Sequence, residues 1–264
     1  MYMDFDYAQV FSKFEESLKN NLFISESEFN NRANRFLSMD FREKSDKEIF
    51  WTIVQVTFYS GIKAIIIEQR EEKIKENLYD YESLVNLTDE EKIGVISKVG
   101  FPKKCQYCFK NAVTFQKLIS EFGSFQNYIS SFGITNTKPK DFDIDRLKTN
   151  LRQRFYGLGP RTVNHFLTDL GFNVLKPDRV VCRIFHRLGL IDSVEDIEGT
   201  IREGKKFETA TGKSIRYIDI IFVKYGQMGK SEVLGTKEGI CLEKNPNCQI
   251  CKVNPFCKYY QDRV

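Results

Sequence analysis

The sequence of 264 residues lacks a long hydrophobic run. No stretch approaches the roughly 20 apolar residues that a membrane-spanning helix requires. The opening segment, MYMDFDYAQVF, also lacks the basic and apolar regions of a secretory signal peptide. These absences predict a cytoplasmic protein with no membrane partner. In that compartment the seven cysteines are expected to bind metal or remain reduced rather than form disulfides.

Signals for β-strands are equally scarce. No segment alternates apolar and polar residues convincingly, and internal repeats and low-complexity segments are missing. Helix signals are frequent: Ser45 with Glu48 and Thr88 with Glu91 read as capping boxes, and Gly100 reads as a stop. We expect helices over 106–122, 143–155, 160–170, 179–188 and 214–227, and one that begins at Ser193. The predicted fold class is all-α.

Composition adds two broad limits. Charged residues make up 29% and hydrophobic residues 41% of the chain, which indicates a soluble globular protein of one domain or two lobes. The net charge is +4, a mild basic excess that is compatible with nucleic-acid binding without being diagnostic of it.

Four cysteines are closely spaced near the C-terminus, in the pattern C-x6-C-x2-C-x5-C. They are Cys241, Cys248, Cys251 and Cys257. Four thiolates at such spacing indicate a metal site, and the spacing alone leaves zinc and a [4Fe–4S] cluster open. The surrounding tail, about 235–264, is polar and loop-like, so we expect a bound cluster to order it.

Two further features carry candidate chemistry. Gly157-Leu158-Gly159-Pro160 lies between two expected helices, and such a hairpin is either a phosphate-binding turn or an ordinary helix connection. Asp178 precedes an apolar helix at the N-cap position. A carboxylate there is either a structural cap or a group that stabilises a developing cation and orients water.

Taken in order, the hairpin, Asp178 and the cysteine tail resemble the helix-hairpin-helix DNA glycosylase superfamily, and within it the iron–sulfur, endonuclease III-like branch. The resemblance covers roughly residues 45–264. It implies two helical lobes with a DNA-binding cleft between them. One lobe is 45–170, which ends in the helix-hairpin-helix; the other is 1–44 plus 171–264, with the cluster loop at about 235–264.

The resemblance also implies roles for individual residues. Asp178 matches the catalytic aspartate, Gly157 and Gly159 match the phosphate-binding hairpin, and the four tail cysteines match the [4Fe–4S] ligands. The implied partner of this monomer is double-stranded DNA, from which a damaged base is flipped out and hydrolysed. The DNA contacts that we expect beside the hairpin glycines are Arg161 and Thr162 after the hairpin, and Tyr59 and Ser60 in the segment FYSGIKA.

Arg161 is a departure from the bifunctional members of that superfamily, which carry a lysine there that forms a Schiff base with the sugar. A guanidinium stays protonated and cannot act as that amine. We therefore predict a monofunctional enzyme that uses water. Another amine, such as that of Lys176, is the alternative.

A second, partial resemblance suggests which damaged base is released. EFGSFQNYISSF and the GPRT hairpin are similar to stretches of the bacterial 3-methyladenine DNA glycosylase I family, although His165 and His186 do not reproduce its zinc-binding pattern. This favours an alkylated purine such as 3-methyladenine. Oxidised or deaminated bases, with or without lyase activity, are the alternative, and a non-catalytic iron–sulfur DNA-binding protein is another.

The remaining chemical groups are expected to be structural. Cys105 and Cys108 read as packed thiols, Cys182 as a core residue, and the two histidines as ordinary helix residues. Four aromatic residues suit either the core or stacking on a flipped base: Trp51, Phe58, Tyr59 and Tyr156. Basic residues around the tail cysteines suit either a DNA backbone or a solvated loop: Lys244, Lys252, Lys258 and Arg263.

Overall fold

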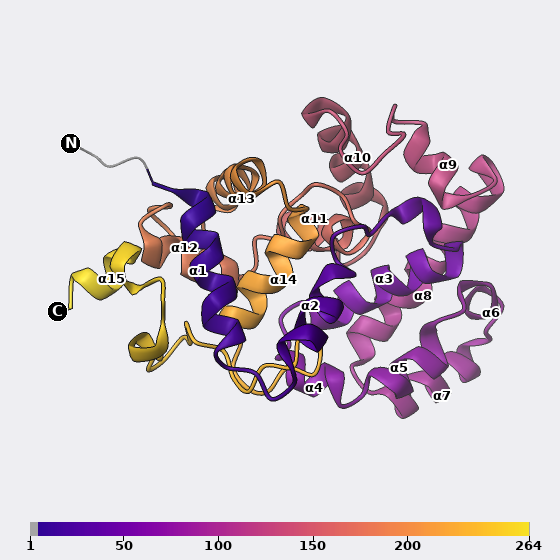
Figure 1. Cartoon of the computed structure of the whole chain (residues 1–264). Coiled ribbons are helices and arrows are strands. Elements are labelled where there is room, and N and C mark those ends of the chain that lie inside the picture. The colour runs from indigo at the N-terminus through magenta and orange to yellow at the C-terminus, as the bar shows by residue number, and fades with distance from the viewer. Residues whose placement is uncertain (1–4, 264) are drawn as a thin grey trace. The chain divides into compact units, whose positions relative to one another are not determined.

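The computed structural model describes residues 5–263, and within that range it is helical with no strand (Figure 1). Two isolated β-bridges join Leu22 and Ser231 to Thr236 there. The all-α prediction is confirmed. No helix of these residues is both long enough and apolar enough to cross a membrane. The expected lobes include residues 1–4 and 264, which lie outside the described range.

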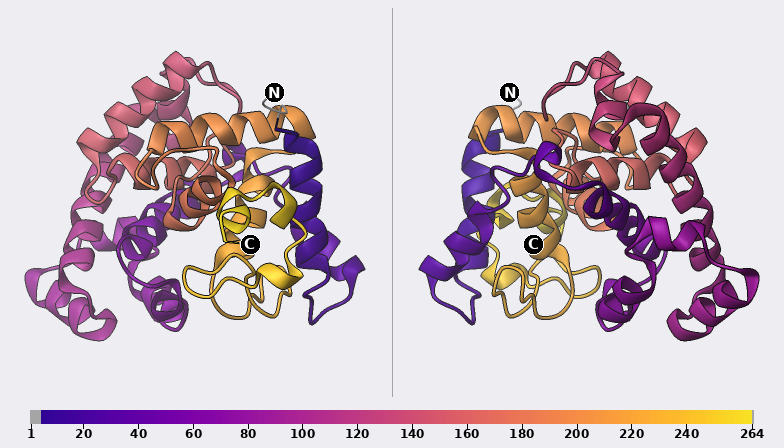
Figure 2. Two further views of the ribbon diagram at one scale, coloured as in Figure 1. Left: turned by 90° about the vertical axis from the view of Figure 1, so that its left-hand side faces the viewer. Right: turned by 90° about the vertical axis from the view of Figure 1, so that its right-hand side faces the viewer.

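The chain divides into two compact units, both built from helices (Figure 2). The first unit combines Met1–Met39 with Asn173–Val264, and the second unit is Asp40–Phe172. Because the first unit combines both ends of the chain, its core requires helices from both ends of the sequence.

The first unit packs its N-terminal helix against helices that follow residue 178, as Figure 1 shows for α1, α13 and α14. Phe11 and Phe14 of α1 meet the ring of Phe222 edge-on, at centroid distances of 5.6 and 5.0 Å. All three rings are essentially buried, and each stabilises the unit by roughly 1.5–3 kcal/mol. The helices of this unit are α1 (Tyr7–Lys19), α2 (Glu26–Asn34), α12 (Arg179–Leu188), α13 (Ile197–Thr211), α14 (Ile215–Gly226), η2 (Cys248–Ile250), η3 (Asn254–Phe256) and α15 (Lys258–Gln261).

The second unit is organised around its longest helix, α8, which packs against α3, α6, α7 and α9. Phe115 of α8 stacks on Phe125 with 4.8 Å between centroids and lies edge-on to Phe50 of α3. The helices of this unit are η1 (Phe41–Glu43), α3 (Asp46–Tyr59), α4 (Ala64–Glu68), α5 (Glu71–Leu78), α6 (Tyr81–Val85), α7 (Asp89–Val99), α8 (Pro102–Phe122), α9 (Phe125–Ser130), α10 (Asp141–Arg154) and α11 (Pro160–Asp169).

The local helix signals were read correctly at most positions. Both capping boxes form at the starts of α3 and α7, and Gly100 ends α7 with φ +77°. The prediction that a helix begins at Ser193 was wrong. Its hydroxyl accepts from the Glu195 N–H in a turn that precedes the helix. The cap of α13 is instead Asp196, whose side chain accepts from the Gly199 N–H at 2.8 Å.

Candidate functional site

The hairpin between α10 and α11 is held in a tight turn by its own sequence. Gly157 has φ +88°, a backbone conformation that favours glycine. A Cβ at this position would lie 3.2 Å from Thr57 Oγ1 of α3 and 3.6 Å from Tyr107 Cδ2 of α8. Pro160 occupies the first position of α11, where its missing N–H costs nothing. The second unit therefore presents the start of α11 in a fixed orientation.

Thr162 stabilises this turn from inside. Its hydroxyl accepts from the Gly159 N–H at 2.6 Å and donates to the Gly157 carbonyl at 2.8 Å. The Leu158 N–H points back to the Phe155 carbonyl at 3.4 Å. Two of the expected DNA contacts, Gly159 and Thr162, thus have polar groups committed within the hairpin. The positive end of the α11 dipole remains at this turn as an attraction for anions.

The sequence around the hairpin is rich in positive charge. Residues 146–168 contain five arginines and lysines and no acidic residue. Arg152 and Arg154 are exposed on the last turn of α10, and Arg161 is half-buried on the first turn of α11. Such a concentration of positive charge beside a helix N-terminus suits a polyanionic ligand.

Tyr59 and Ser60 lie at the end of α3, in the same unit as the hairpin. The Ser60 and Thr57 carbonyls both accept from Lys104 Nζ, at 2.7 and 2.6 Å. Lys104 thereby caps the C-terminus of α3, and burial lowers the pKa of its amine. Tyr59 is half-buried, and burial with nearby Glu71 and Glu68 raises the pKa of its phenol.

Asp178 is the N-cap of α12 in the first unit. Its Oδ1 accepts from the N–H groups of Val180 and Val181, both at 2.9 Å. Its Oδ2 lies 3.5 Å from Lys176 Nζ, which is longer than an ordinary hydrogen bond. The capping role is confirmed. One oxygen performs it, and the other is oriented by a rigid helix start that favours negative charge.

The remaining candidate residues differ in how deeply their side chains are buried. Phe58, Cys105, Cys108 and Cys182 are fully buried, which confirms the two packed thiols and the core cysteine. His165 pairs with Asp169 at 3.0 Å within α11. Tyr156, beside the hairpin, is 46% exposed, whereas Trp51 is half-buried in α3. Of the four aromatic candidates, Tyr156 is therefore the most accessible.

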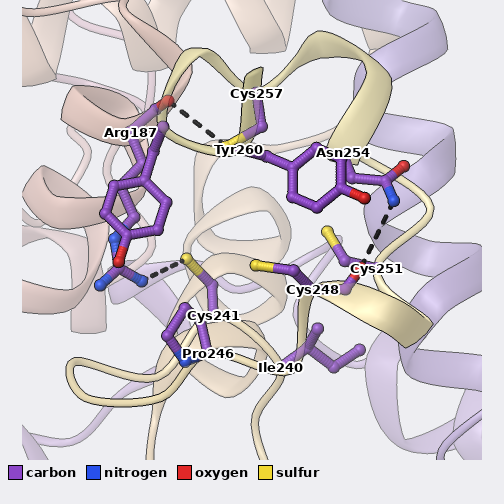
Figure 3. A pocket seen from close by; sticks show the side chains of 10 residues that line it. Arg187, Ile240, Cys241, Pro246, Cys248, Cys251, Asn254, Cys257 and Tyr260 are labelled. Atoms are coloured by element: carbon purple, nitrogen blue, oxygen red, sulfur yellow. Dashed lines mark hydrogen bonds between the residues drawn. The ribbon is translucent and has the colours of Figure 1, made fainter. Parts of the chain in front are cut away.

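The four tail cysteines enter one pocket of the first unit (Figure 3). This pocket holds roughly 290 Å³ of empty space, open solvent included, and is lined by Cys241, Cys248, Cys251, Cys257, Arg187, Ile240, Pro246, Asn254, Tyr259 and Tyr260. Within residues 5–263 no three His, Cys, Asp or Glu side chains gather closely enough to hold a metal ion. Thiolates of a zinc site surround one ion at about 2.3 Å, whereas ligands of a [4Fe–4S] cluster surround four irons and lie further apart. The four thiols are a donor set that suits either zinc or a [4Fe–4S] cluster.

Arg187 of α12 connects its helix to the first cysteine. Its guanidinium donates to Cys241 Sγ at 3.1 Å and to the carbonyls of Leu242 and Glu243 at 2.7 and 3.0 Å. The same group lies over the Tyr259 ring, 4.5 Å from its centroid. A positive charge at this place stabilises thiolates. Burial raises the pKa of Cys248, Cys251 and Cys257, to about 11 for Cys257.

The polar tail contributes side chains to the core of the first unit, which the sequence analysis did not identify. Ile240 and Val253 are 1% and 2% exposed and belong to the hydrophobic core of the first unit. The Lys252 N–H donates to Ser17 Oγ of α1 at 3.0 Å, and Tyr225 of α14 hydrogen-bonds Cys251 Sγ at 2.8 Å. Protein contacts thus position the tail around the pocket, and the basic residues beside it, Lys244, Lys252, Lys258 and Arg263, are exposed.

Comparison with protein-family models found no match. Comparison with curated proteins found none either.

Solved structures of similar fold were found, and they are DNA glycosylases. One is the 8-oxoguanine glycosylase/lyase of Methanocaldococcus jannaschii in complex with DNA that contains 8-oxoguanine. It has a TM-score of 0.56 at 18% identity over 81% of this chain and 95% of that chain. Another is the 8-oxoguanine DNA glycosylase of Thermotoga maritima, with a TM-score of 0.57 at 17% identity over 82% of this chain and 95% of that chain.

A third is endonuclease III in a trapped covalent intermediate with DNA, with a TM-score of 0.59 at 17% identity over 98% of this chain and 99% of that chain. The resemblance to the helix-hairpin-helix DNA glycosylases is confirmed at the level of fold.

Sequence reasoning missed Lys104, Arg187 and Asn111 as positioning residues. Asn111 of α8 exchanges two hydrogen bonds with the backbone of Tyr156, at 2.9 and 2.8 Å. An amide on the inner face of an otherwise apolar helix stretch was the available signal, since a buried amide requires partners.

Proposed function

We propose that this protein is a DNA N-glycosylase of base-excision repair, which flips a damaged base out of duplex DNA and hydrolyses its bond to deoxyribose. The observation that carries the proposal is the fold, which is shared with endonuclease III over 98% of the chain. The positively charged hairpin of the second unit supports it, because a duplex is bound chiefly through its phosphates. In this proposal the two units are the two lobes of the enzyme.

Asp178 is the proposed catalytic group. Loss of the base leaves positive charge on the sugar, and a fixed carboxylate stabilises that charge and orients the water that attacks it. The two backbone N–H groups hold Oδ1 in place. This leaves Oδ2 as the oxygen that faces the reaction.

Hydrolysis by water is the proposed chemistry, because Arg161 stands where bifunctional enzymes have their lysine. The competing amine is that of Lys176, since its Nζ lies 3.5 Å from Asp178 Oδ2. Borohydride traps a Schiff base between protein and DNA. A trapped adduct in the wild type that is lost in Lys176→Ala would overturn the monofunctional proposal and identify the amine.

The proposed substrate is a damaged purine. The GPRT hairpin and EFGSFQNYISSF favour an alkylated base such as 3-methyladenine. The M. jannaschii and T. maritima proteins of similar fold are named for 8-oxoguanine, and this favours an oxidised base as the second candidate. Base release from duplexes that carry either lesion distinguishes the two.

We also propose a [4Fe–4S] cluster held by Cys241, Cys248, Cys251 and Cys257. When bound, it supplies four covalent links between segments of the tail. Arg187 orients the first ligand, and Tyr225 orients Cys251. Four irons per chain and a brown protein are expected, with both lost in Cys251→Ser. A colourless wild type that contains stoichiometric zinc would overturn the cluster and leave the glycosylase proposal intact.

The deciding experiment compares base release by wild type and Asp178→Asn on duplexes that carry 3-methyladenine, 8-oxoguanine or uracil, with and without hot alkali. Asparagine accepts the same two N–H bonds, so the cap is kept while the charge is removed. We expect release by the wild type, strand breakage only after alkali, and a loss of about 10²–10³-fold in rate in the variant. Absence of release from every lesion, with DNA binding retained by both proteins, would identify a non-catalytic binder instead.

A further inference from the structure

One exposed face of α8 combines lysines and tyrosine in a regular pattern. Lys103, Tyr107 and Lys110 are spaced at i, i+4 and i+7, which places them on one side of the helix. From residue 102 to residue 120 this helix has four lysines and no acidic side chain. No carboxylate of that stretch therefore neutralises the face.

Aromatic rings lie between these charges. Lys103 Nζ is 5.8 Å from the centroid of the Tyr107 ring, and Lys110 Nζ is 4.7 Å from that of Tyr156. The two rings are 5.7 Å apart with 30° between their planes. Cation–ring contacts hold the long lysine side chains over a firm surface, which reduces the entropy that they lose on binding a ligand.

This face is continuous with the hairpin. Asn111 binds the Tyr156 backbone through both of its amide atoms, at 2.9 and 2.8 Å. Tyr107 Cδ2 would be 3.6 Å from a Cβ on Gly157, so its ring lies against the turn itself. Whatever the hairpin binds is therefore within reach of the lysines of α8.

We propose that Lys103, Tyr107 and Lys110 form an extension of the hairpin that binds the phosphodiester backbone of duplex DNA. The inference rests on the proposed function and adds a second contact surface to it. Seven helical residues rise about 10.5 Å, which exceeds the roughly 3.4 Å rise of one nucleotide along a strand. The two lysines are thus far enough apart to contact different phosphates of the strand that the hairpin holds.

Alternative polyanions fit less well. A single-stranded ligand would stack its bases on open rings, but both tyrosine rings are already covered in part by the lysines. An acidic protein surface would match the charge. It would not explain why the face adjoins a helix N-terminus suited to phosphate.

The test is the salt dependence of binding to undamaged duplex DNA, measured by fluorescence anisotropy between about 50 and 200 mM salt, the range where counterion release is apparent. The variants are Lys103→Ala/Lys110→Ala and the matched control Lys117→Ala. Lys117 lies on the same helix and is also exposed, but it is one further heptad away from the hairpin. Unfolding in urea verifies that all three proteins are equally folded.

Each phosphate contact contributes about 0.9 to the slope of log K against log salt. We expect the slope of the double variant to fall by about 1.8 and that of Lys117→Ala to stay within about 0.5 of the wild type.

Three results would overturn the inference. An equal slope in the double variant and in Lys117→Ala would remove the α8 contact while leaving the proposed function standing. Failure of the wild type to bind duplex DNA at all would remove both. A loss of binding to polyglutamate, with DNA binding unchanged, would assign the face to an acidic protein partner.

Discussion

Replacing Gly157 by alanine tests whether the shape of the hairpin, in addition to its charge, determines DNA binding. At φ +88° an alanine costs roughly 1–2 kcal/mol relative to glycine. The new Cβ would also stand 3.2 Å from Thr57 Oγ1. That hydroxyl is fixed by its bond to the Ile53 carbonyl at 2.8 Å, so it cannot easily give way. Crowding in a packed site adds about 1–3 kcal/mol.

The free energy of unfolding of Gly157→Ala is therefore expected to fall by about 2–5 kcal/mol. Gly123→Ala is the matched control in the same unit. Its φ is +82°, and the nearest atom to its added Cβ is Asn127 Nδ2 at an ordinary 3.6 Å. This variant lacks the crowding, so the expected loss is roughly 1–2 kcal/mol.

Urea unfolding measures the loss of unfolding free energy in each of the two variants. Fluorescence anisotropy with a labelled duplex measures their DNA affinity, with protein concentrations corrected for the folded fraction. Gly157→Ala should bind duplex DNA more weakly than Gly123→Ala, because its α11 terminus is displaced. Equal losses of stability would refute the crowding argument. Undiminished DNA affinity in folded Gly157→Ala would refute the role of the hairpin.

Three further outcomes follow from single contacts. The Ser45 hydroxyl and N–H hold the pKa of Glu48 below its usual 4.5, so this stabilisation is complete above that pH and is lost as the pH falls through the lowered value. The difference in urea midpoint between wild type and Glu48→Gln should be present at neutral pH and disappear in strong acid. If the proposed cluster is bound, Arg187→Lys should lose iron to a chelator about 10- to 100-fold faster than the wild type, as seen by absorbance, because the bonds to Cys241 and its neighbours are removed. Asp178→Ala should be less stable than Asp178→Asn by about 1 kcal/mol in urea, because only asparagine caps α12.

The features that sequence reasoning identified correctly depend on neighbours three or four residues apart. The capping boxes of Ser45 and Thr88 and the cap at Asp178 are of this kind, because one short segment contains both partners. The prediction that a helix starts at Ser193 was wrong because the short segment there offers two possible caps. Both Ser193 and Asp196 carry side chains that can cap a helix, and only the packing of α13 selects between them.

The positioning contacts of the candidate sites could not be derived in that way. Lys104 reaches the carbonyl of Ser60, and Arg187 reaches that of Glu243, across 44 and 56 residues of sequence. Each is a basic residue on a helix, and nothing local separates it from a solvated one. Ile240 and Val253 were similarly overlooked, since isolated apolar residues in a polar tail become core residues only when another helix covers them.

The net charge of the chain understated its capacity for a polyanion. The chain has 40 basic and 36 acidic residues. Nine of the basic residues and none of the acidic residues lie in 102–120 and 146–168. The rest of the chain therefore has 31 basic and 36 acidic residues and is net negative. Both basic segments belong to the second unit and meet where Asn111 binds Tyr156. Charge gathered in this way steers a polyanion to one surface, whereas the same total spread evenly would not. Salt should therefore weaken DNA binding steeply despite a net charge of only +4.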